Sequence, residues 1–221
     1  KHKITIIGLG AGELDQMPVG IYRLLKNTNF IYARTIEHPV LKELIAEGLK
    51  VESFDHVYES HDQFEAVYEE IAETLIQKAM SQDIIYSVPG HPLIAERTVQ
   101  ILLSEGEKKG IDVQIKGGQS FLDPMFTSVR VDPVEGFQFL DGTGLSLRDI
   151  NITQHLIISQ VYDAFIASEV KLTLMEKYPE FTINLLNIER TGKKVRKDIA
   201  KWSDLRETLE YMYDEVFFEK Y

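Results

Sequence analysis

The stretch ITIIGLGAG at residues 4–12 decides the fold of this chain. Its apolar first half predicts a short buried β-strand, and the glycines that follow predict a tight turn at the carboxyl end of that strand. If this strand belongs to a parallel α/β sheet, further strands must alternate with helices along the chain.

Strand and helix signals do alternate through residue 116. We expect strands at residues 4–7, 30–33, 51–54, 84–88 and 112–115, and helices at residues 19–26, 39–47, 62–80 and 93–105. In the helix at 62–80, Glu65, Glu69 and Glu73 fall on the face opposite the apolar residues. A metal site could use such a row of carboxylates, but a solvated helix face explains it better. The alternation predicts a doubly wound, mostly parallel sheet.

A second α/β lobe is expected after a boundary near residue 117, which gives lobes at residues 1–116 and 117–221. Its predicted strands lie at residues 155–159, 182–186 and 194–199, and its helix lies at residues 163–177 with Asp163 as the N-cap. The basic run at residues 190–201 fits an amphipathic β-hairpin. The fold class is therefore α/β with two lobes, the N-terminal sheet mostly parallel and the C-terminal sheet mixed.

Composition excludes several classes of protein. The 221 residues are 44% hydrophobic and 27% charged, which is ordinary for a globular chain. No apolar run reaches the roughly 18 residues of a membrane span. The chain has zero cysteines, which rules out disulfides and thiolate metal sites and makes the cytoplasm the expected compartment. A net charge of −11 argues against nucleic acid as a partner, because phosphate binding needs clustered Lys and Arg.

The glycine turn fits a dinucleotide-binding fingerprint only in part. Gly8 and Gly10 occupy the first and third positions, but the sixth is Glu13, where glycine or alanine would let helix and strand pack closely. The next helix begins only near Pro18, so a pyrophosphate would lack a helix N-terminus. NAD binding is therefore rejected.

Three glycine-containing turns follow three of the predicted strands, at residues 8–12, 89–92 and 117–120. Because the carboxyl ends of parallel strands meet at one edge of a sheet, we expect the turns to converge there and to form a small-molecule site. Gly90 has two explanations. Its backbone approaches a ligand closely, which we favour, or its turn requires a positive φ.

These turns, in this order, resemble the tetrapyrrole methylases, the class III S-adenosylmethionine-dependent methyltransferases. Residues 4–12 are similar to the family's opening strand and Gly-x-Gly-x-Gly turn. YSVPGHPLIA at residues 86–95 resembles its second motif, usually Gly-Asp-Pro, and KGGQSF at residues 116–121 is similar to its Pro-Gly-x-Ser-Ser motif. HLIISQVY at residues 155–162 matches the strand that opens the family's second domain.

One branch of this family is the most similar. VPGHP at residues 88–92, GFQFLDG at residues 136–142 and SQVYD at residues 159–163 resemble the branch in which the methylase-like domain is fused to a C-terminal MazG-type nucleoside triphosphate pyrophosphohydrolase. The end of the chain, residues 209–221, resembles the junction. The pyrophosphohydrolase is expected downstream of it.

The resemblance implies a bilobal fold that binds S-adenosylmethionine in the cleft between the lobes, usually as a homodimer. Carried over by position, the cofactor-binding residues come from both lobes. They are Gly10, Ala11, Gly90, His91 and Ile94 in the first lobe, and Ser120, Phe121, Gln160, Val161, Leu186 and Asn187 in the second. No catalytic base or metal ligand is assigned, because methyl transfer from a sulfonium depends on positioning and on the exclusion of water.

His91 departs from the family pattern, since most relatives have Asp there. A histidine, neutral or cationic near pH 7, replaces an anionic group beside the sulfonium. A plain loop residue packed between prolines is an equally good interpretation. Two functional hypotheses follow: a methyltransferase, or a non-catalytic S-adenosylmethionine-binding domain that regulates the fused pyrophosphohydrolase.

The methyl acceptor is expected to be a small molecule, for example a tetrapyrrole, whose carboxylates attract cationic side chains. Arg34, Arg97, Arg130 and Arg148 are available, although a solvated helix face is expected for Arg97. The family also has members that act on RNA and on protein, so the resemblance specifies the cofactor better than the acceptor.

Overall fold

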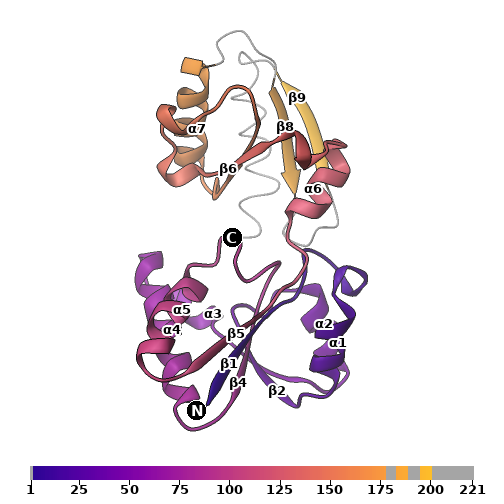
Figure 1. The fold of residues 1–221 in the computed structure, drawn as a ribbon, viewed down its shortest axis with the longest axis vertical. Helices are drawn as coiled ribbons and strands as arrows, with labels where there is room; N and C mark the ends of the chain where they lie inside the picture. The colour runs from indigo at the N-terminus through magenta and orange to yellow at the C-terminus, as the bar shows by residue number, and fades with distance from the viewer. Residues whose placement is uncertain (1, 178–182, 189–194, 201–221) are drawn as a thin grey trace. The chain divides into compact units, whose positions relative to one another are not determined.

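The computed structural model describes residues 2–177, 183–188 and 195–200 of the chain (Figure 1). The chain divides into two compact units, the first reaching Asp123 and the second starting at Pro124. No helix within the described ranges is long and apolar enough to cross a membrane.

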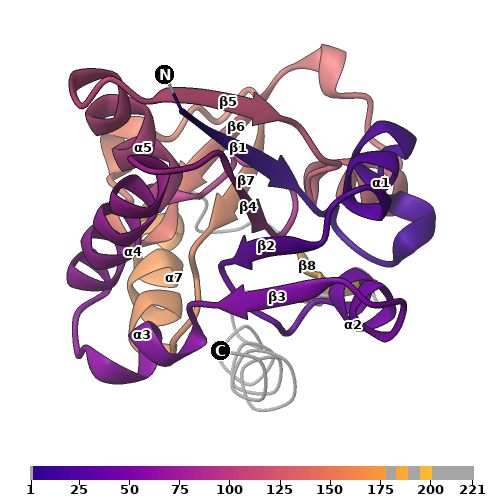
Figure 2. The same ribbon diagram turned by 90° about the horizontal axis from the view of Figure 1, so that it is seen from below.

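The first unit is built on a five-stranded parallel sheet with the order β3-β2-β4-β1-β5 (Figure 2). Its strands are β1 (Lys3–Gly8), β2 (Phe30–Ala33), β3 (Lys50–Ser53), β4 (Ile84–Val88) and β5 (Asp112–Lys116). Its helices are α1 (Val19–Lys26), α2 (Pro39–Ala46), α3 (Asp55–Ser60), α4 (Phe64–Ala79) and α5 (Arg97–Lys108), and a 3-10 helix, η1 (Leu14–Gln16), precedes α1. The predicted doubly wound parallel sheet is confirmed.

Helices cover both faces of this sheet, α1 and α2 on one and α4 and α5 on the other (Figure 1). Because side chains of a strand alternate between the faces, β1 contributes to two cores. Ile6 packs in the core of α4 and α5, and Ile7 packs with Leu25 of α1 and Leu41 of α2. The strand is buried on both faces, which explains its continuous apolar run.

The second unit contains short sheets in the part of the chain that the structure describes. β6 (Phe137–Asp141) pairs in parallel with β7 (His155–Ser159), and β8 (Ile183–Ile188) pairs antiparallel with β9 (Val195–Ala200). The other elements are α6 (Leu122–Val129), which crosses the boundary between the units, α7 (Ala164–Lys177), and the 3-10 helices η2 (Pro133–Glu135), η3 (Gly142–Gly144) and η4 (Leu147–Asp149). The Asp163 side chain accepts a hydrogen bond from Ile166 N at 2.7 Å, as expected for a helix cap.

The sequence pattern does not predict α3, α6 or β6, and it places the start of α5 four residues too early. α3 has six residues and buries only Val57, so it is too short to show helical periodicity. Residues 93–96 form a turn instead of helix: Ile94 N donates to His91 O at 3.0 Å, and Ala95 has a φ of +55°. A left-handed residue cannot continue a right-handed helix, and so α5 begins at Arg97.

Candidate functional site

At the carboxyl ends of β1 and β4, the connecting loops leave toward opposite faces of the sheet. The two strands are neighbours, but the loop after β1 leads to α1 on one face and the loop after β4 leads to α5 on the other (Figure 1). Open α/β sheets bind ligands at such a topological switch point. The topology therefore selects this edge as the candidate site.

Gly10 and Gly90 join the two loops by a pair of backbone hydrogen bonds. Gly10 N donates to Gly90 O at 3.2 Å, and Gly90 N donates to Gly10 O at 2.9 Å. Both residues have a positive φ, +86° at Gly10 and +63° at Gly90, which only glycine adopts without strain. The positive φ considered for Gly90 is therefore confirmed, and its close approach to a ligand stays a prediction. Within the described part of the chain, a Cβ on Gly90 would have only Gln119 O near it, at 4.0 Å, so space for a ligand group also remains.

The third loop packs directly against the other two. A Cβ on Gly8 would lie 2.3 Å from Gly90 O and 2.6 Å from Gly118 N, and a Cβ on Gly118 would lie 2.3 Å from Gly90 O. No real Cβ tolerates such distances. Gly8 and Gly118 are thus needed for the contact of three backbones rather than for the approach of a ligand. The structure brings the three predicted turns together at one edge of the sheet.

His91 holds the turn between β4 and α5. Its Nδ1 accepts a hydrogen bond from Leu93 N at 3.1 Å, and its ring lies beside Gly117, where an added Cβ would be 2.7 Å from Nε2. An Asp side chain makes the same bond to the amide two residues ahead in an Asx-turn. This shared turn geometry explains how the loop accommodates histidine. Contact between His91 and a cofactor stays a prediction.

His38 contacts the candidate site but was not identified from the sequence. Its side chain is 2% exposed, Nε2 lies 3.1 Å from Gly10 O, and Nδ1 accepts from Val40 N at 3.3 Å. Since Nδ1 accepts, the proton is on Nε2, which donates to the Gly10 carbonyl. The position before Pro39 indicates a helix N-cap, and His38 does cap α2. Nothing in the local sequence indicates the contact with Gly10.

Arg34 forms an ion pair with Glu96 of this chain. It follows β2, and its Nη1 lies 3.0 Å from Oε1 of Glu96, whose side chain is 6% exposed. Tyr86 of β4 is fully buried, and its hydroxyl has no hydrogen-bond partner among the residues the structure describes. Burial, and then the charge of Glu96, raise the pKa of Tyr86 well above its ordinary value. The Arg34–Glu96 ion pair connects the end of β2 to the turn that precedes α5.

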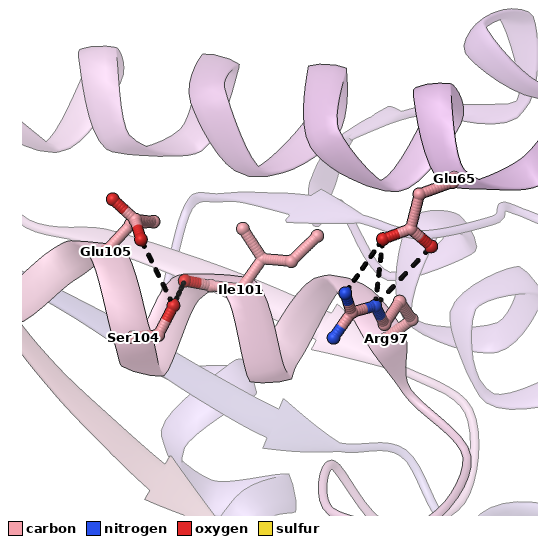
Figure 3. Close-up of polar contacts among 5 residues, drawn as sticks. All are labelled: Glu65, Arg97, Ile101, Ser104 and Glu105. Carbon is pink, nitrogen blue, oxygen red and sulfur yellow. Dashed lines mark hydrogen bonds and ion pairs between the residues drawn. The ribbon is translucent and has the colours of Figure 1, made fainter.

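Arg97 lies outside the candidate site. Its guanidinium binds Glu65 of α4, with Nη2 to Oε1 at 2.8 Å and Nε to Oε1 at 3.1 Å (Figure 3). Both side chains are more than half exposed, so the pair connects α4 and α5 at the surface. Arg97 is thus a surface residue, as expected. No three His, Asp or Glu side chains among the described residues come together as a metal site.

The other predicted cofactor-binding residues are distributed over both units. Ser120 Oγ accepts from Leu122 N at 3.2 Å at the start of α6, next to Phe121, while Ala11 and Ile94 lie in the loops after β1 and β4. Gln160 directly follows β7 with a φ of +61°, an uncommon conformation for a residue with a side chain. Val161 comes next, and Leu186 and Asn187 belong to β8. Their roles in cofactor binding stay predictions.

Several solved structures share this fold. Uroporphyrin-III C-methyl transferase from Thermus thermophilus, in complex with S-adenyl homocysteine, has a TM-score of 0.65 at 22% identity and covers 93% of this chain and 91% of that chain. Diphthine synthase has a TM-score of 0.63 at 18% identity and covers 92% of this chain and 84% of that chain. At these identities the similarity shows the fold alone.

Sequence comparison identifies the family. The chain is 53% identical over 178 residues to the uncharacterized protein YabN of Bacillus subtilis (strain 168), a match that covers 80% of this chain. The chain spans only 36% of that relative's length. Residues 3–202 match the Tetrapyrrole (Corrin/Porphyrin) Methylases. The chain therefore belongs to the tetrapyrrole methylase family.

Proposed function

We propose that the chain binds S-adenosylmethionine at the carboxyl edge of the first sheet and transfers its methyl group to a small-molecule acceptor such as a tetrapyrrole. The observation that carries the proposal is the Gly10–Gly90 pairing at the switch point between β1 and β4. The family, and the S-adenyl homocysteine named in the complex of one structural neighbour, support this cofactor.

The residues at this edge fit such a ligand. Among the described residues, only Gln119 O lies within 4.0 Å of a Cβ added at Gly90, which leaves room for a ligand group beside the backbone. When bound, S-adenosylmethionine supplies an electrophilic methyl group that needs in-line approach and exclusion of water. The task of the loops is to bind and orient, and the proposed contacts in the first unit are those predicted above.

Calorimetric titration with S-adenosylmethionine and S-adenosylhomocysteine tests the proposal. We expect saturable heat and a rise in melting temperature with either ligand, because a ligand that binds only the folded state stabilises it. NAD is the matched control and should give neither signal. No heat and no thermal shift at millimolar S-adenosylhomocysteine would remove the proposed function.

A second candidate is a non-catalytic sensor that regulates a fused MazG-type pyrophosphohydrolase. Histidine at position 91 motivates it, since its Nδ1 already accepts a hydrogen bond within the turn, and the side chain at this position offers no carboxylate to the cofactor. The sensor should bind the cofactor without methylating a porphyrinogen, and pyrophosphate release by the longer protein should change when S-adenosylmethionine is added. Methylation of a porphyrinogen would instead identify the chain as an enzyme.

His91→Asp tests whether position 91 affects cofactor binding. The aspartate keeps the bond to Leu93 N and restores the family's anionic group. If the histidine has weakened cofactor binding, the variant should bind S-adenosylmethionine more tightly at an unchanged melting temperature. An unchanged affinity would show that position 91 serves only the turn.

We also propose that the chain forms a homodimer in the cytoplasm, as the family resemblance and the cysteine-free composition suggest. Analytical ultracentrifugation measures the first property directly. A single monomeric species at high micromolar concentration would contradict it.

A further inference from the structure

The two ring nitrogens of His38 make hydrogen bonds that serve two different purposes. Through Nδ1 it accepts from Val40 N and caps α2, and through Nε2 it donates to Gly10 O, 28 positions earlier in the chain. The first bond stabilises helix α2. The second reaches a loop of the proposed cofactor site.

The bond from His38 gives the Gly10 carbonyl its second hydrogen-bond donor. Gly10 O accepts from Gly90 N at 2.9 Å and from His38 Nε2 at 3.1 Å. A carbonyl oxygen has two lone pairs, so these two donors fix the direction in which it points. All peptide bonds of the described residues are trans. The carbonyl of Gly10 and the N–H of Ala11 share one planar unit, and fixing the first fixes the second.

We propose that His38 is a positioning residue that locks the Gly10–Ala11 peptide plane in the orientation that the cofactor requires. The inference rests on the proposed function, because it assumes that the loop after β1 binds the cofactor. Without the imidazole, the carbonyl of Gly10 loses one of its two donors, and the conformational freedom of glycine lets the peptide rotate at low cost. Cofactor affinity then falls because the bound orientation must be restored on binding.

Two substitutions separate the two bonds of His38. His38→Asn places an acceptor near the Nδ1 position, so it keeps the cap of α2 but is too short to reach Gly10 O. His38→Gln places a donor near the Nε2 position and can keep the bond to Gly10, but glutamine is a poor N-cap. Both variants lose the packing of the buried ring, which makes them a matched pair. His38→Ala loses both bonds.

Thermal stability and cofactor affinity should rank His38→Asn and His38→Gln in opposite orders. His38→Asn should melt about 2–4 °C above His38→Gln, because a lost cap costs about 1 kcal/mol. In titrations with S-adenosylhomocysteine on folded protein, His38→Gln should bind about tenfold more tightly than His38→Asn. A purely structural role for His38 predicts the same order for stability and affinity.

The outcomes are distinct. Equal affinity of His38→Asn and His38→Gln would overturn the inference while wild-type binding leaves the proposed function in place. Failure of the wild-type chain to bind S-adenosylhomocysteine would overturn both. If His38→Asn does not fold, the comparison of His38→Gln with His38→Ala decides alone. Glutamine can bond to Gly10 O and alanine cannot, so the inference expects tighter binding by His38→Gln, and equal affinities refute it.

Discussion

Gly8 and Gly20 differ in what surrounds them. A Cβ on Gly8 would collide with the backbones of Gly90 and Gly118, whereas a Cβ on Gly20 in α1 would meet no described residue within 4 Å. Gly8→Ala should therefore destabilise the chain by about 2–3 kcal/mol through overpacking. Gly20→Ala should stabilise it by up to about 1 kcal/mol through helix propensity. Urea unfolding measures both. A Gly8→Ala variant as stable as Gly20→Ala would show that the three loops do not touch.

Gly90→Val tests whether the edge of β4 is the ligand site. Its φ of +63° makes a side chain there strained by about 1–2 kcal/mol, so the melting temperature should fall. Gly110→Val is the matched control, because Gly110 also has a positive φ, +74°, and a Cβ there meets no described residue within 4 Å. Gly110 lies between α5 and β5, at the opposite end of the strands. S-adenosylhomocysteine affinity, corrected for the folded fraction, should be lost in Gly90→Val and kept in Gly110→Val.

Tyr86 should make stability depend on pH in the alkaline range. Its pKa is raised in the folded state, so above pH 10 or so the unfolded chain releases the phenol proton while the folded chain retains it. The free energy of unfolding must then fall as pH rises, and the contribution is fully present only below the ordinary pKa.

Tyr86→Phe removes this dependence. Because the buried hydroxyl has no partner in the described residues, the variant should equal or exceed the wild type by up to about 1 kcal/mol near neutral pH. Its advantage should grow above a pH of about 10. Urea midpoints of both proteins across this range measure the difference. A constant difference would place the hydroxyl in contact with water.

At the scale of elements, two ion pairs connect helices and strands with different strengths. Arg34–Glu96 joins the end of β2 to the start of α5 with side chains 22% and 6% exposed, and Arg97–Glu65 joins α4 to α5 with both above 50%. Arg34→Met should cost about 3 kcal/mol, because it leaves the Glu96 carboxylate buried without this cation. Arg97→Met should cost under about 1 kcal/mol, because solvent screens the surface pair.

A double variant provides the control for the buried pair. Arg34→Met combined with Glu96→Leu should recover much of the loss, because no charge is then left buried. Denaturant unfolding of the four proteins gives the coupling. Equal losses for Arg34→Met and Arg97→Met would contradict the difference in burial.

At the scale of the whole molecule, charge decides which partners are accessible. A net charge of −11 repels nucleic acid. We expect no retention on immobilised RNA at about 0.15 M salt, and any weak binding at low salt should fall steeply as salt is added. Clear retention at physiological salt would favour RNA as the methyl acceptor and would count against a small molecule.

The fold of the first unit was predictable because local patterns encode it. The bounds predicted for α1, β2 and β4 are those observed, since each is a run of one periodicity. The alternation of these runs then gives a parallel sheet. Elements without such a pattern were missed. β6 depends on its pairing with β7, which no window of sequence contains.

The sequence by itself determined the class of fold, the family and the three turns that meet at one edge, because each is encoded in consecutive residues and in their order. Only the tertiary structure decided what the residues of these turns do. The backbone of Gly8 touches that of Gly118, His38 bonds to Gly10 across 28 positions, and Arg34 bonds to Glu96 across 62. Such contacts depend on which strands become neighbours, and that is settled only when the whole sheet has formed.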